Sequence, residues 1–261
     1  MTTISNDDLF AVTEKNVVIT GGGQGLGRTM ALGLAQRGAN IAIVDINAET
    51  AETTSAEVQG LGVRSMAIKA DLTDERLAKH AITTITDQWG TIDVLINNAG
   101  MAVFGPAEEM SLDDFKSVFE IDVFAMFTCS KAAFGPMAAK KQGNIINISS
   151  ICGMVVTVPQ KYATYNSAKA GVNLLTKSLA VEWAPFNIRV NGIAPGYMLT
   201  PPVRALKAED PERYEFWMSR IPMERAGEPE ELVGTVVYLA SEASAYMTGN
   251  VIVIDGGYTC L

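Results

Sequence analysis

Short apolar runs alternate with longer amphipathic stretches along almost the whole chain, and this alternation restricts the folds that it can adopt. We predict that the apolar runs are strands, over residues 16–20, 41–45, 64–70, 93–97, 144–149, 189–194 and 250–254. Helices are predicted between them, over residues 25–37, 48–61, 74–89, 111–140, 162–183 and 229–240. Buried strands joined by helical crossovers form a parallel sheet with helices on both faces. The pattern therefore predicts an α/β fold with a doubly wound parallel sheet of about seven strands.

The chain has 261 residues, which is enough for one large α/β domain and barely enough for two small ones. Because it contains no internal repeat and no linker rich in Pro, Gly or Ser, we predict a single domain over residues 1–261. One segment, at about 198–229, interrupts the alternation with prolines, a charged patch and several aromatic residues. It follows a predicted strand at the sheet edge where such folds bind ligands, so we predict a substrate lid with one or two short helices. The alternative is a surface insertion without function.

Charge and hydropathy exclude several classes of protein. The net charge is −9 and the isoelectric point is near 4.7. A surface of this sign repels phosphate backbones, so no nucleic-acid partner is expected. No apolar run approaches the roughly 18 residues needed to span a bilayer, and residues 1–10 lack the basic residues of a signal or transit peptide. We therefore expect a cytoplasmic protein that does not bind membranes.

The cysteines and the single histidine narrow the chemistry further. Cys129, Cys152 and Cys260 are widely spaced, which favours neither a disulfide framework nor a metal site. His80 falls in a predicted helix and is expected to be a solvated surface residue. A Ser-His-Asp hydrolase is therefore not favoured.

A glycine-rich turn, TGGGQGLG at residues 20–27, follows the first predicted strand and opens the first predicted helix. Glycines allow a backbone to approach a pyrophosphate closely, and the helix N-terminus stabilises its negative charge. The spacing of Gly21, Gly25 and Gly27 differs from the usual G-x-G-x-x-G of dinucleotide-binding turns. The position of the turn still predicts a dinucleotide cofactor, and a purely structural strand-to-helix turn is the alternative.

Asp45 ends the second predicted strand, eighteen residues after Gly27. A carboxylate at this place accepts hydrogen bonds from an adenosine ribose and repels a 2′-phosphate. Neither Ile46 nor Asn47 supplies a positive charge, and Gln24 inside the turn is also uncharged. These features favour NAD over NADP.

Tyr165 and Lys169 lie four positions apart, so both side chains are on one face of a predicted helix. A phenol has an ordinary pKa of about 10, which is too high for a base at neutral pH. A neighbouring cation favours the phenolate and lowers that pKa. The Ser150 hydroxyl is a candidate to hold a substrate oxygen beside the phenol. These three residues predict a proton-transfer site for an alcohol or a carbonyl.

Ordered motifs over about residues 12–258 resemble those of the short-chain dehydrogenase/reductase family. They are TGGGQGLG at 20–27, DLTD at 71–74, NNAG at 97–100, INISS at 146–150, YNSAK at 165–169, RVNGIAPG at 189–196 and IDGG at 254–257. The resemblance implies a Rossmann-type fold, a nicotinamide dinucleotide cofactor and hydride transfer between an alcohol and a ketone.

The resemblance also implies roles for particular residues. Tyr165 is expected to be the acid/base, Lys169 to lower its pKa and hold the nicotinamide ribose, and Ser150 to orient the carbonyl. Ser150 is preferred to Ser149 because Gly153 completes the Ser-x-x-Gly pattern of the family. The implied cofactor contacts are Gly21, Gln24, Gly25, Leu26, Gly27, Asp45, Asp71, Leu72, Asn97, Asn98, Ala99, Gly100, Tyr165, Lys169, Pro195, Gly196, Met198 and Thr200.

One catalytic position departs from the family pattern. Members usually carry an asparagine in the long helix before the serine strand, where it supports a water that links the lysine to solvent. This chain has Asp122 there, which can accept a hydrogen bond from a water but lacks the amide donor. It also brings a negative charge near Lys169, which is expected to alter the titration of Tyr165.

The substrate side of the site is predicted from weaker signals. Ser150 and Tyr165 lie fifteen positions apart, and the loop between them looks like that of polyol dehydrogenases and ketose reductases. So do IPMERAGEPEEL at 221–232 and the final IDGGYTCL. The predicted substrate contacts are Ser150, Cys152, Gln160, Tyr165 and Tyr197, and further pocket candidates are Met101, Val103, Phe104 and Met154.

These signals predict an NAD-dependent enzyme that oxidises a secondary hydroxyl of a linear polyol and reduces the matching ketose. Two alternatives stay open: a 3-oxoacyl-thioester or other ketone reductase of the same family, and a regulator that binds NAD without turnover. The presence of Ser150, Tyr165 and Lys169 argues against the regulator, for which Asp122 is the only support. The resemblance also suggests a homotetramer with the helices at 111–140 and 162–183 in its interface.

Overall fold

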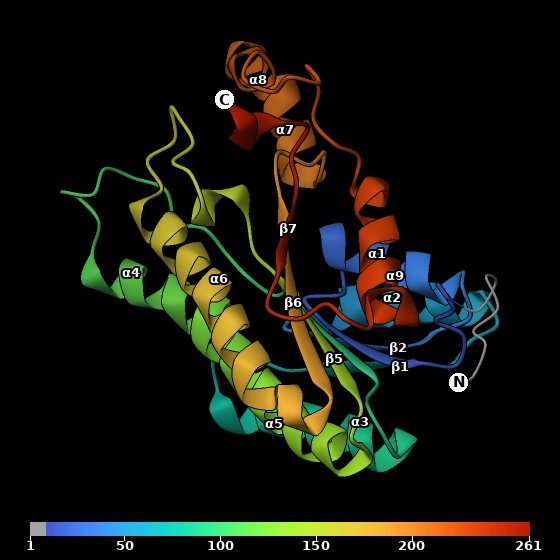
Figure 1. The fold of residues 1–261 in the computed structure, drawn as a ribbon. Coiled ribbons are helices and arrows are strands. Elements are labelled where there is room, and N and C mark those ends of the chain that lie inside the picture. Colours follow the sequence, from blue (N-terminus) through green and yellow to red (C-terminus); the bar gives the residue numbers. More distant parts are fainter. Residues whose placement is uncertain (1–8) are drawn as a thin grey trace.

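The computed structural model describes residues 9–261, and a single parallel sheet runs through its centre. The strands are β1 (Asn16–Thr20), β2 (Asn40–Asp45), β3 (Ser65–Lys69), β4 (Val94–Asn97), β5 (Gly143–Ile148), β6 (Ile188–Pro195) and β7 (Val251–Ile254). Their order is β3-β2-β1-β4-β5-β6-β7, and every neighbouring pair is parallel (Figure 1). The predicted doubly wound sheet is confirmed. Residues 1–8, on which the expectation about targeting peptides mostly depends, lie outside the described residues.

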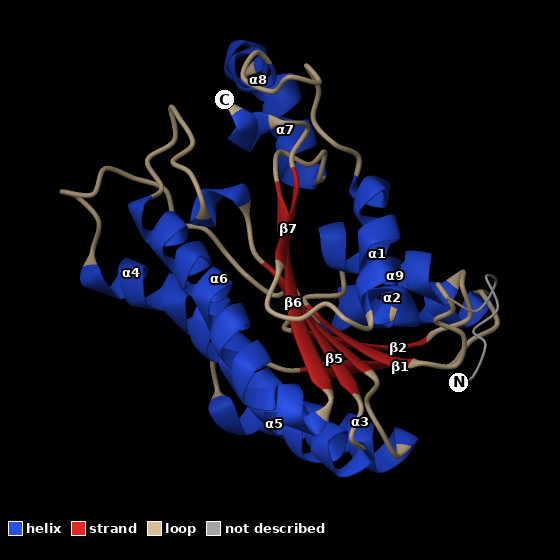
Figure 2. Cartoon of the chain, in the orientation of Figure 1, coloured by secondary structure: helices blue, strands red, loops and turns tan. Residues whose placement is uncertain are grey.

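Helices cover both faces of the sheet, which Figure 2 shows as a red layer between blue helices. On one face pack α1 (Gly25–Ala35), α2 (Ala48–Gly60) and α9 (Val233–Ala240). On the other face pack α3 (Glu75–Trp89), α5 (Ala125–Lys140) and α6 (Ala163–Trp183). Within β1, Val17 and Ile19 belong to the first core and Val18 to the second, and all three are fully buried. Burial on both faces explains why the central strands are mainly apolar and do not alternate regularly with polar residues.

The long helix predicted over residues 111–140 is interrupted in the structure. Helix α4 (Leu112–Phe119) leads into a π-helical turn over Glu120–Phe124, and α5 follows directly. Such wide turns are common at functional sites. Asp122 lies in this turn and is fully buried. No glycine or proline marks the junction, so the sequence alone indicates one continuous helix.

The segment at residues 198–229, called the lid below, contains the two short helices α7 (Pro201–Glu209) and α8 (Pro211–Met218). Figure 1 shows them beyond the carboxyl ends of β6 and β7, beside the C-terminus. The lid has a small core of its own, made by Tyr214, Trp217, Met218, Ile221 and Ala226. The prediction of short helices in this segment is therefore confirmed.

Among residues 9–261, no helix is long and apolar enough to cross a bilayer. The same residues also contain no group of three or more His, Cys, Asp or Glu side chains that could hold a metal ion.

Candidate active site

The glycine-rich turn joins β1 to α1 where the strand order changes direction. Gly21 and Gly25 have φ angles of +61° and +55°, which L side chains rarely adopt. A Cβ atom on Gly27 would collide with the carbonyl oxygen of Gly21. Asn98 fixes the turn by donating from Nδ2 to the carbonyl oxygens of Thr20 (3.0 Å) and Gly21 (2.9 Å). The bare backbone at the start of α1 therefore has the form of a pyrophosphate cradle.

A first pocket, of about 480 Å³, lies beside this turn. Its lining includes residues that the sequence predicts as cofactor contacts: Gly21, Gln24, Asp45, Asp71, Leu72, Asn98, Ala99 and Gly100. The Asp45 carboxylate accepts hydrogen bonds from the backbone N–H groups of Gly23 (2.9 Å) and Asn47 (3.0 Å). These bonds hold the carboxylate in place at the pocket wall.

A second pocket, of about 450 Å³, shares Asn98, Gly100 and Met101 with the first. Its lining includes further predicted residues: Leu26, Phe104, Ser150, Tyr165, Lys169, Pro195, Gly196, Tyr197, Met198 and Thr200. Two adjoining pockets fit the adenosine and nicotinamide halves of a dinucleotide, with the glycine turn between them for the pyrophosphate. The residues present therefore suit the cofactor that the sequence predicts.

Ser150 lies at the end of β5, and its hydroxyl accepts a hydrogen bond from the backbone N–H of Cys152 at 3.1 Å. Ser149 is engaged elsewhere, because its Oγ donates to Asn173 Oδ1 at 2.6 Å. A Cβ atom on Gly153 would lie 2.6 Å from a backbone carbonyl on α6, so the absence of a side chain allows α6 to approach this loop. The Ser-x-x-Gly pattern thus has a packing reason, and Ser150 rather than Ser149 is free to face a substrate.

Lys169 is almost fully buried, and three contacts fix its amino group. Nζ lies 3.1 Å from Asp122 Oδ2, donates to the carbonyl oxygen of Ile148 at 3.1 Å, and lies 5.5 Å from the centre of the Tyr165 ring. Asp122 Oδ1 accepts a hydrogen bond from the backbone N–H of Met101 at 2.8 Å. Asp122 therefore connects the chain after β4, which lines both pockets, to Lys169 on α6.

The surroundings of Tyr165 raise its pKa above the ordinary value. Burial is the largest cause, the negative charge of Asp122 acts in the same direction, and hydrogen bonding with Ser150 opposes both. Burial also raises the pKa of Asp122, while Lys169 lowers it. This upward direction for the pKa of Tyr165 differs from the lowering expected from Lys169, because burial dominates and the negative charge of Asp122 adds to it.

Several residues singled out in the sequence line neither pocket: Gly25, Gly27, Asn97, Val103, Asp122, Cys152, Met154 and Gln160. Two of these, Cys152 and Gln160, belong to the predicted set of substrate contacts, and their polar groups have partners inside the protein. Cys152 Sγ lies 3.6 Å from Thr157 Oγ1, and the Gln160 amide lies 2.9 Å from the Tyr197 hydroxyl. Both polar groups are thus occupied inside the protein, which the sequence of the loop does not reveal.

Tyr162 is a pocket residue that the sequence analysis misses. It lies three positions before Tyr165, about one helical turn away, and this spacing is the signal that identifies it. Burial raises the pKa of Tyr162 to about 12, so at neutral pH it is a phenol that can donate a hydrogen bond. The rings of Tyr162 and Phe104 pack with their centres 4.6 Å apart. Pro202 and Val203 bring α7 into the same lining.

Comparison with known proteins identifies the family. A family profile described as enoyl-(acyl carrier protein) reductase matches residues 21–259. The chain belongs to the short-chain dehydrogenase/reductase family. It is 39% identical over 256 residues to a sorbose reductase of Candida albicans, covering 97% of this chain and 90% of that protein. It is 37% identical over 266 residues to a ribulose-forming D-arabinitol 2-dehydrogenase of Scheffersomyces stipitis, covering 96% of each.

Solved structures of the family superpose closely on the chain. An NAD⁺-bound xylitol dehydrogenase is 33% identical with a TM-score of 0.89, covering 94% of this chain and 99% of that one. A gluconate 5-dehydrogenase of Burkholderia cenocepacia, in complex with NADP and tartrate, is 34% identical with a TM-score of 0.91, covering 97% and 98%. The chain is therefore an NAD(P)-binding oxidoreductase that interconverts secondary alcohols and ketones.

Proposed function

We propose that this protein is an NAD-dependent polyol dehydrogenase that interconverts a neutral linear polyol and its ketose. The lining of the second pocket carries the proposal. Its hydroxyl-bearing side chains are Ser149, Ser150, Tyr162, Tyr165, Tyr197 and Thr200. Among the described residues that line it, the one charged side chain is Lys169, which is paired with Asp122. Hydroxyl groups without a free cation suit a neutral, hydroxyl-rich substrate better than a sugar acid.

Relatives are named for both neutral and acidic sugars, and those named for neutral ones support the same substrate class. The sorbose reductase and the D-arabinitol 2-dehydrogenase are named for neutral sugars and polyols. The gluconate 5-dehydrogenase is named for an acid, whose carboxylate would need a compensating charge when buried. The paired state of Lys169 therefore favours the neutral group of relatives.

A second candidate has support of its own. Met101, Phe104, Met198 and Val203 give the second pocket a large apolar surface. An apolar wall of this kind would also accept a 3-oxoacyl thioester or another lipophilic ketone. A regulator without turnover has less support, because Ser150, Tyr165 and Lys169 all line the same pocket.

The mechanism assigns a task to each residue around the reacting carbon. When bound, the nicotinamide would supply the hydride acceptor in oxidation and the hydride donor in reduction. Ser150 holds the substrate oxygen, and Tyr165 as phenolate takes the hydroxyl proton in oxidation and returns it in reduction. Since the pKa of Tyr165 is raised, the phenol is protonated at neutral pH, which favours ketone reduction there and alcohol oxidation at higher pH. Lys169 would hold the nicotinamide ribose.

Asp45 is the proposed basis of the preference for NAD. Its carboxylate lines the first pocket and would accept hydrogen bonds from the adenosine ribose. A 2′-phosphate at the same place would bring like charges together. Because relatives with NAD and with NADP are both known, this preference needs a direct test.

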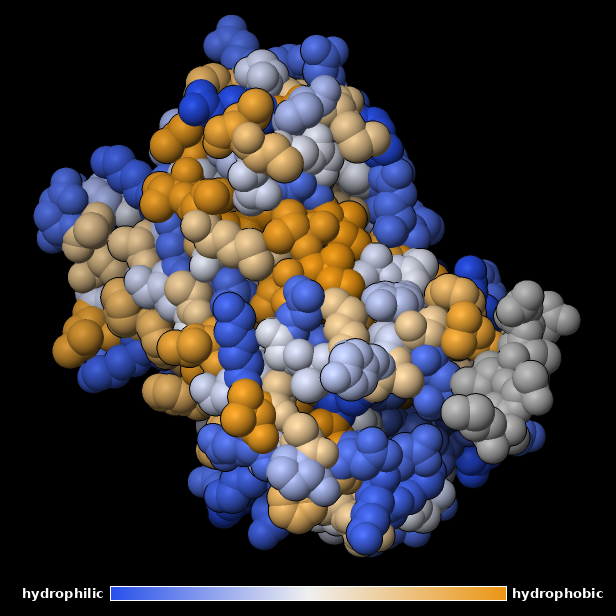
Figure 3. Space-filling model, in the orientation of Figure 1, coloured by the Kyte–Doolittle hydropathy of each residue, from blue (hydrophilic) through white to orange (hydrophobic). Residues whose placement is uncertain are grey.

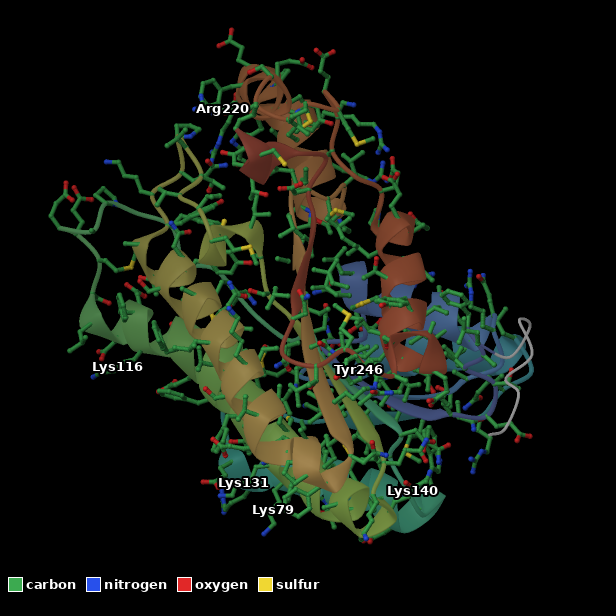
Figure 4. The ribbon with its side chains drawn as sticks, in the orientation of Figure 1. Lys79, Lys116, Lys131, Lys140, Arg220 and Tyr246 are labelled. Atoms are coloured by element: carbon green, nitrogen blue, oxygen red, sulfur yellow. The ribbon has the colours of Figure 1, made fainter. Side chains whose placement is uncertain are left out.

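We also propose a homotetramer. Apolar side chains on the outer helical face are 43–77% exposed: Phe124, Phe127, Leu174 and Val181. A second apolar surface follows β7 at the sheet edge, where Figure 3 shows hydrophobic residues gathered between the lid and α9. Tyr246, labelled in Figure 4, projects from the segment before β7. Two such surfaces are typical of association sites, and sedimentation velocity would measure the assembly.

The cytoplasmic location stays a prediction.

A substrate panel tests the function. With NAD, we expect kcat/KM to be highest for five- or six-carbon polyols and about tenfold or more lower for gluconate and simple 2-alkanols. With NADH, we expect kcat/KM for an acetoacetyl thioester to be lower by a similar factor, about tenfold or more. A higher kcat/KM for the alkanols or the thioester than for the polyols would identify the protein as a ketone reductase and not a polyol dehydrogenase. Tighter binding of NADPH than of NADH would overturn the assignment of Asp45.

A further inference from the structure

A buried polar cluster connects the loop after β5 with the lid. Its members are Thr157, Gln160, Tyr197 and Trp217, each less than 9% exposed except for the half-buried Tyr197. We propose that Gln160 is a positioning residue: its amide latches the lid, and the Tyr197 wall of the substrate pocket, to the loop that begins at Ser150. Gln160 would then govern substrate affinity without contacting the substrate.

The hydrogen bonds of Gln160 carry the first step. In the amide orientation that satisfies both polar atoms, Oε1 accepts from the indole Nε1 of Trp217 at 2.6 Å and from the Tyr197 hydroxyl at 2.9 Å. The amide nitrogen then donates to the carbonyl oxygen of Val158 at 2.9 Å. In either orientation the Tyr197 hydroxyl lies 2.9 Å from the amide. The acceptor capacity of the amide oxygen is used inside the protein, which leaves little for a substrate hydroxyl.

The packing of Tyr197 carries the second step. Its ring stacks on Trp217 with centres 4.6 Å apart and an interplanar angle of 21°, and the edge of Tyr258 approaches it with centres 5.8 Å apart. Its carbonyl oxygen accepts a hydrogen bond from the N–H of Gly227, at the end of the lid, at 2.9 Å. Because Tyr197 also lines the second pocket, a shift of Trp217 would move the pocket wall.

Loss of the amide would weaken the closed lid in a defined way. The indole N–H of Trp217 would stay buried without an acceptor, and a buried donor without a partner is costly. Opening the lid would return that donor to water, so open forms would gain population and the apparent substrate affinity would fall. The proton chemistry at Tyr165 uses Ser150 and Lys169, which lie outside the cluster, so it should be preserved once substrate is bound.

The test compares Gln160→Met, which keeps the side-chain length, with Trp217→Phe, which keeps an aromatic ring but removes the indole N–H. We expect Gln160→Met to raise KM about tenfold, because it leaves the indole N–H without an acceptor, and Trp217→Phe to raise KM less, because it removes that donor. In both variants kcat should stay within about twofold and NADH affinity should be unchanged. In the double variant Trp217→Phe should reduce the effect of Gln160→Met on KM, because no buried indole N–H is left without an acceptor. Gln142→Met, at an exposed glutamine after α5, is the matched control and should behave as wild type.

Hydrogen–deuterium exchange supplies a readout that needs no substrate. Amides of residues 201–218 should exchange faster in both single variants than in wild type and in the control. Unchanged exchange in the lid, or single-variant effects on KM that multiply in the double variant, would overturn the latch. An effect of Gln160→Met on KM that Trp217→Phe does not reduce would also overturn it and would restore a direct substrate contact for Gln160. Because the exchange does not depend on turnover, failure of the polyol assignment alone would leave this result intact.

Discussion

The two pockets along the carboxyl edge of the sheet are formed by different parts of the chain. The first is centred on the bare backbone of the glycine turn and is completed by residues at the ends of β2 and β3 and in the chain after β4. The second consists mainly of side chains from segments far apart in the sequence, namely the end of β5, α6, the end of β6 and α7. A pocket of backbone is set once the fold is set, whereas a pocket of side chains can change specificity without a change of fold. This difference explains why relatives that act on different sugars share one architecture.

The largest effect is expected for a substitution that disables the second pocket and leaves the first one intact. Tyr165→Phe removes the proton acceptor of the second pocket and keeps the ring, so kcat should fall about 10²- to 10⁴-fold. NADH affinity, measured by fluorescence titration, should change little, since the first pocket is untouched. Tyr238→Phe on α9, outside both linings, is the control for loss of a phenol hydroxyl. Retention of more than about a tenth of wild-type turnover would contradict the catalytic role of Tyr165.

The converse experiment disturbs the backbone pocket. In Gly27→Ala the new Cβ would collide with the Gly21 carbonyl and lie 2.7 Å from Asn98 Nδ2. Overpacking of this kind costs about 1–3 kcal/mol. We therefore expect NADH affinity to fall about 10- to 100-fold and the melting temperature to be lower. Gly60→Ala, at the end of α2 with nothing within 4 Å, is the matched control and should bind NADH normally. Normal affinity in Gly27→Ala would mean that the turn adapts, contrary to the proposed rigidity.

The features that can be read from the sequence are local in the chain and belong to both pockets. The sheet, the glycine turn and Asp45 are readable because their determinants are neighbours in the chain: apolar runs, adjacent glycines and the last residue of a strand. Tyr165 and Lys169 are readable for the same reason, since helical spacing places both on one face.

The features that the sequence does not reveal, Tyr162 apart, depend on contacts between distant segments. Gln160 faces Tyr197, 37 positions away, and nothing in its own loop indicates that its amide is already occupied. The π-helical turn that carries Asp122 has no local sequence mark. Such features depend on which side chains meet after folding, so they follow from the packed structure and not from the pattern of one segment.

A moderate effect is expected for the preference between NAD and NADP, which we assign to the Asp45 side chain in the first pocket. Asp45→Ser removes the charge that would repel a 2′-phosphate, so the ratio of NAD to NADP affinity should fall by about tenfold. Asp87→Ser, at an exposed aspartate on α3, controls for the change in net charge. A ratio that stays the same in Asp45→Ser would show that the backbone alone selects the cofactor.

The smallest effect concerns Asp122, where the two regions meet, because this residue bonds both to Met101 beside the pockets and to Lys169. Its charge raises the pKa of Tyr165, so Asp122→Asn should lower that pKa. Oxidation requires the phenolate and rises as pH passes this pKa, so the rising limb of its pH–rate profile should move to lower pH, by about one unit. The fall of ketone reduction at high pH should move in the same direction, because reduction requires the protonated phenol. Asp113→Asn on α4, whose carboxylate is exposed, should leave both profiles in place. Unmoved profiles in Asp122→Asn would mean that burial keeps Asp122 protonated in the working enzyme, and that Lys169 acts on Tyr165 with its full charge.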